Sequence, residues 1–404
     1  MIVRVARWIA PIVLAITLCF GLIAWAEAAA PQPPELDCTA AVLIDPETKQ
    51  LLYEHNADER RYVASLTKMM TALLVAESGN LQRTVTVSRT AANVGETTMN
   101  LTAGEEITVE HLLMGTMMTS ANDAAVACGE AVSGSLDAFI ERMNERAKEL
   151  GMTGTHFVNP NGLHDDDHYS TAHDMALLAI QVMGRAELRP IVRMREATVP
   201  WPSKPHDRKL INRNRLLEYW PAADGIKTGY TRQANDCLAA SAYVDGWRLI
   251  CVVLGCETKP WNEARALLEW GFDSFLKVAL VSTELTPATV EVAGGVEDIV
   301  NAKPVEDVIA VLPRGPIAEP ALTGGVVQAP VAAGQVVGSL EVPMPDGTMR
   351  SVDLVATAPV ARSPWAEVLH DRRYFLALAA IVALAVGVLV HGAATEALGS
   401  RRTG

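Results

Sequence analysis

The sequence predicts an α/β domain, in which helices cover a central antiparallel sheet, followed by a small all-β domain and a C-terminal transmembrane helix. Three observations predict these parts. Segments with strand character enclose a long helix-rich region, a Val-, Pro- and Gly-rich segment begins near Val281, and an uncharged apolar run extends from Tyr374 to Val390. Strands contributed from both ends of a helical region indicate one antiparallel sheet that is closed by its own first and last segments.

The composition of the chain limits its function classes. It has 404 residues, with 34 Lys and Arg against 47 Asp and Glu, and its formal net charge is −13. A general nucleic-acid binder carries the opposite charge, so we expect no nucleic-acid partner. With 50% apolar and 20% charged residues, the chain is neither disordered nor fibrous, and its length favours two or three domains.

Residues 1–28 have the character of a secretory signal peptide. Two arginines precede an apolar stretch over residues 8–25, and small residues follow it. A cleavage site that ends at Ala26 or Ala28 fits the A-x-A rule. An uncleaved anchor is the alternative, and in either case the domains that follow are exported.

Residues 35–280 are predicted to form the α/β domain. Two strands joined by a turn at Pro46 open it, and a helix-rich region follows to about Gln181. Three further strand segments and a last helix close it. The expected strands cover residues 40–45, 50–56, 225–230, 238–244 and 248–254, and the last helix covers residues 261–275.

Residues 281–360 are predicted to form the small all-β domain. Helix formers are few there, and alternating apolar residues flank Pro345-Asp346-Gly347, which is typical of a hairpin turn. The segment contains no His or Cys and no carboxylate cluster. We therefore expect it to hold the first domain away from the membrane, with protein binding as the weaker alternative.

The C-terminal apolar run predicts a transmembrane anchor over residues 374–394. From Tyr374 to Val390 the sequence is YFLALAAIVALAVGVLV, which is uncharged and close to the roughly 20 residues that cross a bilayer. A buried C-terminal helix is the alternative, but no polar stripe exists to face water. With the preceding domains exported, the anchor would hold them at the extracytoplasmic face of the cell membrane and leave a short cytoplasmic tail.

Five cysteines lie outside the leader, and they predict no disulfide framework. Their number is odd, their spacing is irregular and no C-x-x-C pair occurs. Most lie in apolar runs, where a small buried thiol is the expected state, and any pairing among them stays open. The five residues are Cys38, Cys128, Cys237, Cys251 and Cys256.

The sequence SLTK at residues 65–68 opens a predicted helix whose apolar residues form a buried stripe. Ser65 and Lys68 are three residues apart, so their side chains share one face near the free backbone N–H groups of the helix start. A hydroxyl, an amine that can take its proton and a donor for the oxyanion are the parts of an acyl-transfer site. The lysine can act as a base only if burial or a second cation lowers its pKa.

Two further motifs supply the partners that such a site needs. SAN at residues 120–122 follows a helical run, and KTG at residues 227–229 lies on a predicted strand, where Gly229 would let a ligand backbone lie along the sheet edge. Single motifs are weak, because a second S-x-x-K begins at Ser274 and another S-x-N, at residues 78–80, fits the end of a helix better. The order of the three motifs is therefore the informative signal.

The order S-x-x-K, S-x-N, K-T-G on an exported chain resembles that of penicillin-binding proteins and class A β-lactamases. From about Leu36 to Val360 the chain resembles the D-alanyl-D-alanine carboxypeptidases, which are low-molecular-mass penicillin-binding proteins of serine peptidase type. The segments that carry this resemblance are YVASLTKMMTALL, NPNGLHDDDHYSTAHDMA, NRNRLL before DGIKTGYT, and VEDVIAVLPRG. The resemblance implies a β-lactamase-like transpeptidase fold, a second β domain, a membrane tether and removal of the last D-alanine from peptidoglycan stem peptides. It also implies inhibition by β-lactam antibiotics.

Carried over residue by residue, the resemblance implies a role for each motif residue. Ser65 would be the nucleophile and Lys68 its general base. Ser120 and Asn122 would relay the leaving-group proton and hold the substrate amide. The backbone N–H groups of Ser65 and Tyr230 would form the oxyanion hole, a role that survives although many relatives have histidine where Tyr230 stands.

The substrate carboxylate would be held by the third motif. Lys227 would supply positive charge and Thr228 a hydroxyl. Some relatives place an arginine where Asn262 stands, and Asn262 can offer only a neutral amide. We therefore expect Lys259 or Arg265, which are near in sequence, to assist.

The run HDDDH at residues 164–168, with His173 and Asp174 behind it, has residue types that bind zinc or calcium. No H-E-x-x-H motif is present, and a charged run after Asn161-Gly162 is more typical of a solvated loop. We expect structural roles for His173 and Asp174, and neither a metal nor a cofactor.

Two alternative functions stay open at this point. A β-lactamase would need an E-x-x-L-N loop between the second and third motifs, and the nearby sequence ELRP at residues 187–190 does not fit it. A non-catalytic scaffold that binds peptidoglycan would have no need for an activated nucleophile. The intact motifs favour the enzyme over both.

Overall fold

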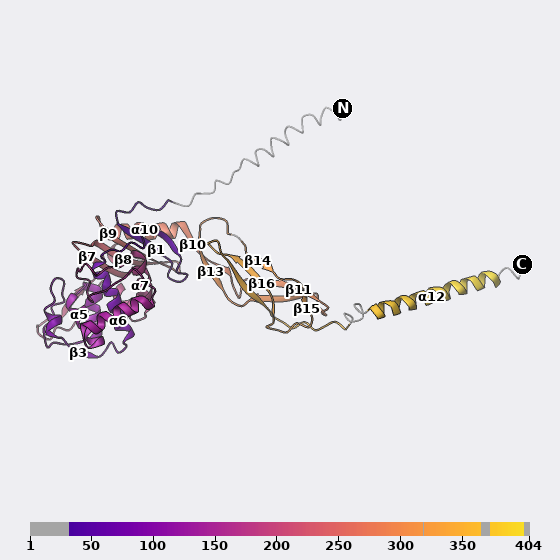
Figure 1. Ribbon diagram of the computed structural model, residues 1–404, viewed down its shortest axis with the longest axis horizontal. Helices are drawn as coiled ribbons and strands as arrows, with labels where there is room; N and C mark the ends of the chain where they lie inside the picture. Colours follow the sequence, from indigo (N-terminus) through magenta and orange to yellow (C-terminus); the bar gives the residue numbers. More distant parts are fainter. Residues whose placement is uncertain (1–31, 318, 365–371, 400–404) are drawn as a thin grey trace, which may run out of the picture. The chain divides into compact units, whose positions relative to one another are not determined.

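The structure is a computed structural model, and it describes residues 32–317, 319–364 and 372–399 (Figure 1). The chain divides into two compact units, an N-terminal unit up to Leu276 with a short return at residues 313–315, and a C-terminal unit. The predicted signal peptide at residues 1–28 lies outside the described residues. We describe each unit by itself.

The N-terminal unit contains a five-stranded sheet in the order β2-β1-β9-β8-β7. Its first strand pairs antiparallel with its last, because Ala40 lies opposite Leu254 and Ile44 lies opposite Ile250. The predicted closure of the sheet by its own first and last segments is therefore confirmed. The strands are β1 (Ala40–Ile44), β2 (Leu51–His55), β7 (Ala223–Thr231), β8 (Asn235–Val244) and β9 (Trp247–Cys256).

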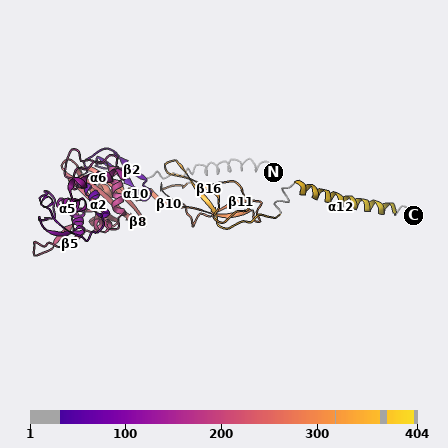
Figure 2. The same ribbon diagram turned by 60° about the horizontal axis from the view of Figure 1, so that its bottom comes forward.

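Helices cover both faces of this sheet, which is why all five residues of β1 are buried. Alternate residues of the strand face opposite sides. Ala40, Val42 and Ile44 belong to one apolar core with α2 (Lys68–Glu77), and Ala41 and Leu43 belong to a second core with α10 (Pro260–Ser274). Figures 1 and 2 show α10 on one side of the strands and the helical layer on the other.

The helical layer lies between β2 and β7 in sequence, as predicted. Threonine or serine side chains cap several of its helices; for example, Thr171 accepts a hydrogen bond from the backbone N–H of Asp174 at the start of α7. Two small antiparallel strand pairs, β3–β4 and β5–β6, belong to the same part of the chain. The strands of these pairs are β3 (Thr84–Thr86), β4 (Glu106–Thr108), β5 (Glu196–Val199) and β6 (Arg208–Ile211). The remaining helices are α3 (Arg89–Ala92), α4 (Val109–Met114), α5 (Asn122–Ser133), α6 (Leu136–Glu149), α7 (Ala172–Gly184), α8 (Leu188–Arg193) and α9 (Leu216–Tyr219).

The C-terminal unit contains the small β domain that the sequence predicts. The expected hairpin joins β16 to β17, and the Asp346 carboxylate accepts hydrogen bonds from both the N–H and the hydroxyl of Thr348 in the turn. A six-stranded sheet has the order β14-β16-β17-β12-β11-β15, and β10 pairs with β13. The strands are β10 (Phe275–Val281), β11 (Ala288–Ala293), β12 (Ile299–Pro304), β13 (Val308–Pro313), β14 (Ala321–Thr323), β15 (Val327–Gln328), β16 (Val336–Pro343) and β17 (Met349–Ala356).

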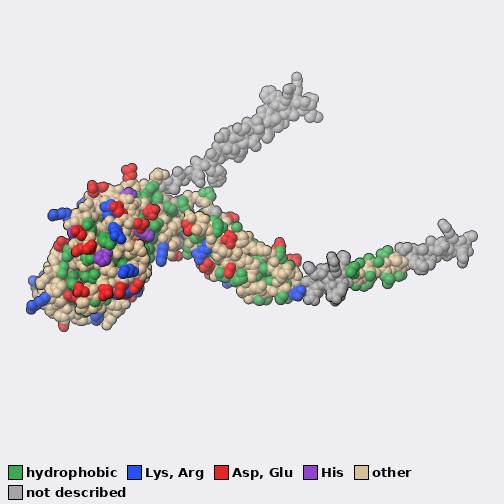
Figure 3. All heavy atoms as spheres, in the orientation of Figure 1, with side chains coloured by type: hydrophobic (Ala, Val, Ile, Leu, Met, Phe, Trp, Pro, Cys, Tyr) green, Lys and Arg blue, Asp and Glu red, His purple; other side chains and the backbone are tan. Residues whose placement is uncertain are grey.

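The last helix, α12, runs from Arg372 to Gly399. Its described side chains are those of Tyr374 and residues 376–388, and they are mostly hydrophobic and exposed (Figure 3). Within the described residues, none of the helices combines the length and the apolar character that crossing a bilayer requires. The transmembrane anchor expected over residues 374–394 is therefore not confirmed and stays a prediction.

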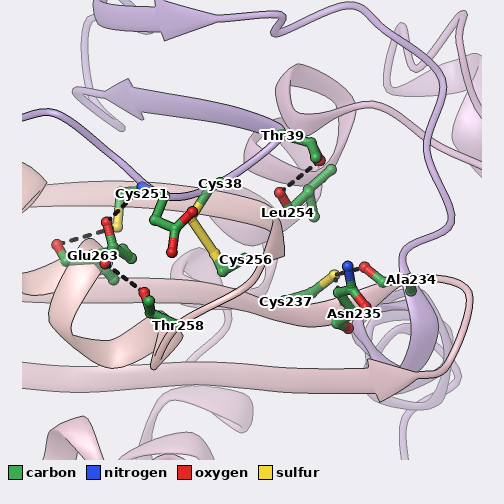
Figure 4. The surroundings of a disulfide bond; sticks show 12 residues. Cys38, Thr39, Ala234, Asn235, Cys237, Cys251, Leu254, Cys256, Thr258 and Glu263 are labelled. Atoms are coloured by element: carbon green, nitrogen blue, oxygen red, sulfur yellow. Dashed lines mark hydrogen bonds between the residues drawn. A yellow bond between two sulfur atoms is a disulfide. The ribbon is translucent and has the colours of Figure 1, made fainter.

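One disulfide settles the pairing that the sequence leaves open. Cys38, just before β1, bonds to Cys256, the last residue of β9, although 218 residues separate them (Figure 4). Pairing of β1 with β9 brings the two together, which no spacing rule in the sequence reveals. Cys128, Cys237 and Cys251 are free and buried, as expected, and burial raises the pKa of each thiol.

We expect the double variant Cys38→Ala/Cys256→Ala to lose about 2–5 kcal/mol in free energy of unfolding, as for native disulfides in other exported proteins. Urea unfolding with and without reductant measures this loss. Reductant should destabilise the wild type and leave the double variant unchanged. Alkylation of Cys38 in unreduced, denatured wild type would contradict the bond.

Candidate active site

The three motifs meet beside the edge strand β7, and each motif lies on a different type of secondary structure. Ser65 lies in a 3-10 turn, η1 (Ala64–Thr67), and Lys68 is the first residue of α2. The predicted helix thus begins as a tighter turn, since residues 64–67 make i to i+3 bonds. Ser120 follows the wide turn η2 (Gly115–Thr119), while Asn122 begins α5.

The Lys68 side chain is fully buried beneath Ser65. Its Nζ lies 2.9 Å from Ser65 Oγ, 2.7 Å from Asn122 Oδ1 and 2.5 Å from the carbonyl oxygen of Asn161. One amine therefore joins the first motif, the second motif and the loop at Asn161. Every polar contact of this amine is to an uncharged group, so no carboxylate holds it in its charged form.

Burial is the main reason that the pKa of Lys68 lies well below its usual range. The positive charges of Lys227 and Arg213 lower it further, while Glu96 and Asp123 act in the opposite direction. Asp123 is buried, and its carboxylate accepts hydrogen bonds from the backbone N–H groups of Met99 and Leu101. The site therefore favours a neutral Lys68 amine beside the Ser65 hydroxyl.

A second buried lysine lies beside the second hydroxyl. Lys227, on β7, is 1% exposed, and its Nζ lies 2.9 Å from Ser120 Oγ and 2.8 Å from the carbonyl oxygen of Thr228. Burial first, and Arg213 second, lower the pKa of Lys227 to about 7. Near neutral pH this lysine can therefore both hold and release a proton.

The backbone is strained where the hydroxyls are presented. Ser120 has a φ of 63°, and Ala64, directly before Ser65, has a φ of 46°. Residues other than glycine adopt this left-handed region at a cost, and such residues gather at functional sites. Ala121 N–H donates to the carbonyl of Gly115, and Asn122 N–H donates to the carbonyl of Thr97, so neighbouring bonds hold the turn at Ser120 in place.

Two glycines allow close approach to the turn that carries Ser65. A Cβ atom at Gly162 would lie 2.0 Å from the carbonyl oxygen of Ala64, and one at Gly229 would lie 3.1 Å from Ser65 N. Gly162 lets the Asn161 carbonyl reach Lys68, and Gly229 brings β7 against the Ser65 backbone. The sequence predicts a ligand-binding role for Gly229 and only a loop for the Asn161-Gly162 pair, and it carries no signal for the contact that this loop makes with Lys68.

A cavity of about 730 Å³ opens above these groups. Five of the eight predicted site residues, Ser65 among them, line it, together with two arginines that were not predicted as site residues, Arg213 and Arg215. Lys259 and Arg265 are not among the residues that line it; Lys259 lies over the Trp261 ring and Arg265 pairs with Glu269. The predicted residues in its wall, besides Ser65, are Ser120, Thr228, Gly229 and Tyr230.

The histidines and carboxylates after Asn161-Gly162 have structural contacts. His168 is buried, its Nε2 lies 2.7 Å from Thr67 Oγ1, and burial lowers its pKa to about 4, so it is neutral. Asp174 accepts hydrogen bonds from the backbone N–H of Gly154 and the hydroxyl of Thr155. Among the described residues, no group of three His, Cys, Asp or Glu side chains is arranged to hold a metal ion.

The second S-x-x-K sequence is a different structure. Ser274 is the last residue of α10 and is buried, whereas Lys277 lies on β10. The two residues share no helical turn, so the spacing that places Lys68 beneath Ser65 has no such effect here. Geometry thus separates the two copies, which the sequence alone could do only by context.

Comparison with known proteins identifies the family of the chain. A family model described as D-alanyl-D-alanine carboxypeptidase matches residues 27–258, and a model for the C-terminal domain of penicillin-binding protein 5 matches residues 275–362. The chain is 35% identical over 338 residues to D-alanyl-D-alanine carboxypeptidase DacF of Bacillus subtilis, covering 80% of this chain and 85% of DacF. It is 37% identical to DacC of Escherichia coli, covering 77% of this chain and 81% of DacC.

Solved structures of two such proteins have the same fold. Penicillin-binding protein 5 from Haemophilus influenzae superposes with a TM-score of 0.67 at 31% identity, covering 82% of this chain and 99% of that structure. The carboxypeptidase DacD from Francisella tularensis superposes with a TM-score of 0.66 at 29% identity, covering 82% of this chain and 96% of that structure. With its sheet, its helices and its small C-terminal β domain, the chain belongs to the D-alanyl-D-alanine carboxypeptidase family of low-molecular-mass penicillin-binding proteins.

Proposed function

We propose that Ser65 is the nucleophile of this serine-type D-alanyl-D-alanine carboxypeptidase and that Lys68 is its general base. The observation that carries the proposal is the 2.9 Å contact between Ser65 Oγ and a buried Lys68 amine whose pKa lies well below its usual range. The substrate is the stem peptide of peptidoglycan, and the enzyme removes its terminal D-alanine through an acyl-enzyme on Ser65.

In the first step the neutral Lys68 amine takes the Ser65 proton while Oγ attacks the carbonyl carbon of the penultimate D-alanine. The backbone N–H groups of Ser65 and Tyr230 stabilise the oxyanion that forms. The leaving amine needs a proton, and Ser120 can pass one to it from Lys227, which lies 2.9 Å behind it. The terminal D-alanine then leaves, and Ser65 carries the acyl group.

The remaining motif residues hold the substrate on either side of this bond. Asn122 is fixed by its contact with Lys68 and by the hydrogen bond from its Nδ2 to the carbonyl of Gly95, so its amide can orient the substrate amide. Lys227 supplies positive charge for the substrate carboxylate, and Thr228 supplies a hydroxyl in the cavity wall. Gly229 leaves room for the substrate backbone along β7.

We infer the location from the same resemblance and from the two ends of the chain. Residues 1–28 serve as an export signal, and residues 374–394 tether the enzyme to the extracytoplasmic face of the bacterial cell membrane. Export suits a chain with a disulfide, since such bonds persist in oxidising compartments.

We expect penicillin to label Ser65 covalently and to leave Ser274 unmodified. A β-lactam amide mimics the scissile bond, and the labelled serine is the one with a base beside it. Lys68→Arg and Lys68→Ala should each reduce acylation about 100-fold or more, because an arginine does not lose its proton in a protein and an alanine has none to exchange. Intact-mass analysis and peptide mapping measure both effects, and D-alanine release from a D-alanyl-D-alanine peptide measures turnover.

Three results would contradict this assignment. They are a label on Ser274, near-normal acylation of Lys68→Arg, and no release of D-alanine from the peptide by the wild type. Rapid loss of the penicillin label, with free enzyme regained at once, would instead favour a β-lactamase.

We expect Arg213→Gln to move the pH profile of acylation to higher pH. The charge of Arg213 lowers the pKa of both Lys68 and Lys227, so its removal raises both values. Acylation requires Lys68 neutral and Lys227 protonated, so the acidic limb and the alkaline limb should both shift upward. Acylation rates with a fluorescent penicillin between about pH 5 and pH 10 measure the profile.

The matched control is Lys209→Gln. Lys209 lines the same cavity, but its charge is already paired with Glu196 at 2.7 Å. Its removal should leave the profile in place. An unchanged or acid-shifted profile for Arg213→Gln would contradict the electrostatic role of Arg213.

We expect a chain of residues 32–364 to be soluble and fully active. The motif residues and the cavity all lie before residue 262, and the proposed tether lies after residue 373. The cut should not fall at Val360, because Ser363 N–H still donates to the carbonyl of Gly294 in the C-terminal unit. Sedimentation with membrane vesicles and peptide turnover test this; a truncated protein that still sediments would place the tether elsewhere.

A further inference from the structure

The segment that follows β6 presents two arginines to the catalytic cavity. Buried and exposed residues alternate along this segment. Asn212 and Asn214 are buried, whereas Arg213 and Arg215 are exposed and line the cavity. The Asn212 amide donates to the carbonyl of Met194, and the Asn214 amide donates to the carbonyl of Gly225 on β7. The alternation of buried amides and exposed cations fixes the direction of both arginines.

Two aromatic rings hold the Arg215 guanidinium in place. Its Cζ lies 5.4 Å from the ring centre of Tyr219 and 5.4 Å from that of Trp261. Trp261 also lines the cavity. Contact with ring faces orients a cation and restricts its rotamers, but it does not neutralise the charge.

The charge of Arg215 is unpaired in the described part of the chain. No carboxylate there lies within ion-pair distance of it, although Glu218 lines the same cavity. Lys209, which shares the cavity, is by contrast paired with Glu196 at 2.7 Å. Arg215 is therefore an oriented cation in the wall of the cleft that is free to take an external anion.

The segment that carries Trp261, one of the two rings beside Arg215, is fixed by further contacts. Trp261 lies five residues after Cys256, which is bonded to Cys38. Two residues beyond Trp261, the Glu263 carboxylate accepts hydrogen bonds from the backbone N–H of Asp37 and from the hydroxyl of Thr258 (Figure 4). The disulfide and Glu263 thus fix the segment that carries Trp261 at both of its ends.

We propose that Arg215 is a specificity-determining residue that binds the free C-terminal carboxylate of the substrate and selects carboxypeptidase substrates over neutral ones. The proposal rests on the proposed function, because a carboxypeptidase must accommodate a carboxylate on the leaving-group side of its cleft. A planar guanidinium can bind a carboxylate through two parallel N–H···O bonds. Preorganisation by Tyr219 and Trp261 reduces the side-chain entropy that such binding loses.

Arg215 acts separately from the proton chemistry. Arg213 is the arginine whose charge lowers the pKa of Lys68 and Lys227. Loss of the Arg215 charge should therefore change substrate binding and leave the pH profile of acylation where it is. This distinguishes a specificity residue from one that merely supports the site.

The test compares two substrates with the same acyl part. One is an acyl-D-alanyl-D-alanine peptide, and the other is the matching acyl-D-alanine methyl ester, whose leaving group carries no carboxylate. For Arg215→Gln, kcat/KM on the peptide should fall about 10- to 100-fold, mainly through KM, because a charge-assisted hydrogen bond is lost. The kcat/KM on the ester should stay within about twofold of the wild type, since that substrate never used the charge.

Matched variants complete the test. Lys209→Gln removes a cation that is already paired, and it should change neither substrate by more than about twofold. Trp261→Leu should raise KM for the peptide alone, and Trp261→Phe, which keeps a ring beside Arg215, should restore it. The ester measurement also shows whether each variant is folded and can form an acyl-enzyme.

Equal losses on peptide and ester in Arg215→Gln would overturn the proposal and leave Arg215 a structural role. Unchanged kinetics on both substrates would overturn it as well. A wild type that consumes the ester but not the peptide would contradict the proposed function itself, and the role of Arg215 with it. Because the wild type is measured on both substrates, failure of the Arg215 proposal can be distinguished from failure of the proposed function.

Discussion

The burial of Lys68 against Ser65 is the constraint on which the rest of the site depends. An amine enclosed by protein loses its hydration, and its charged form becomes unfavourable unless an anion pairs with it. The structure surrounds Nζ with neutral oxygens from Ser65, Asn122 and Asn161 instead. These contacts satisfy the hydrogen-bonding capacity of the amine and supply no negative charge. The environment of Lys68 therefore makes its amine a proton acceptor.

That enclosure requires backbones to come closer than ordinary packing permits. Gly162 and Gly229 have no side chain at the points where the loop and β7 contact the turn around Ser65. Ala64 and Ser120 adopt left-handed backbone conformations in the same site. Strain of this kind persists only where surrounding structure determines it. Here pairing with β8 in the five-stranded sheet holds β7, and the apolar core that contains Met69, Met70 and Leu73 holds α2.

The sequence predicts the closed sheet, the β domain and the meeting of three motifs, because hydrophobic periodicity and motif order are local signals. It does not predict contacts made by main-chain groups or by distant pairs. The Asn161 carbonyl has no side-chain signature, and Cys38 and Cys256 meet only through the register of β1 with β9. Nearness in sequence is a poor guide for Lys259 and Arg265, since the two arginines in the cavity wall belong to a segment anchored on α8 and β7.

The two buried lysines also set how the stability of the N-terminal unit depends on pH. An exposed lysine in an unfolded chain has a pKa of about 10.4, whereas Lys227 in the folded protein has a pKa of about 7. Between these two pKa values the unfolded chain binds more protons than the folded one, so the free energy of unfolding rises with pH across this window. Below pH 7 Lys227 is protonated in both states, and the full cost of burying its charge is present. The shift of Lys68 has the same direction and adds to the effect. The apolar cores on the two faces of the sheet must offset this cost.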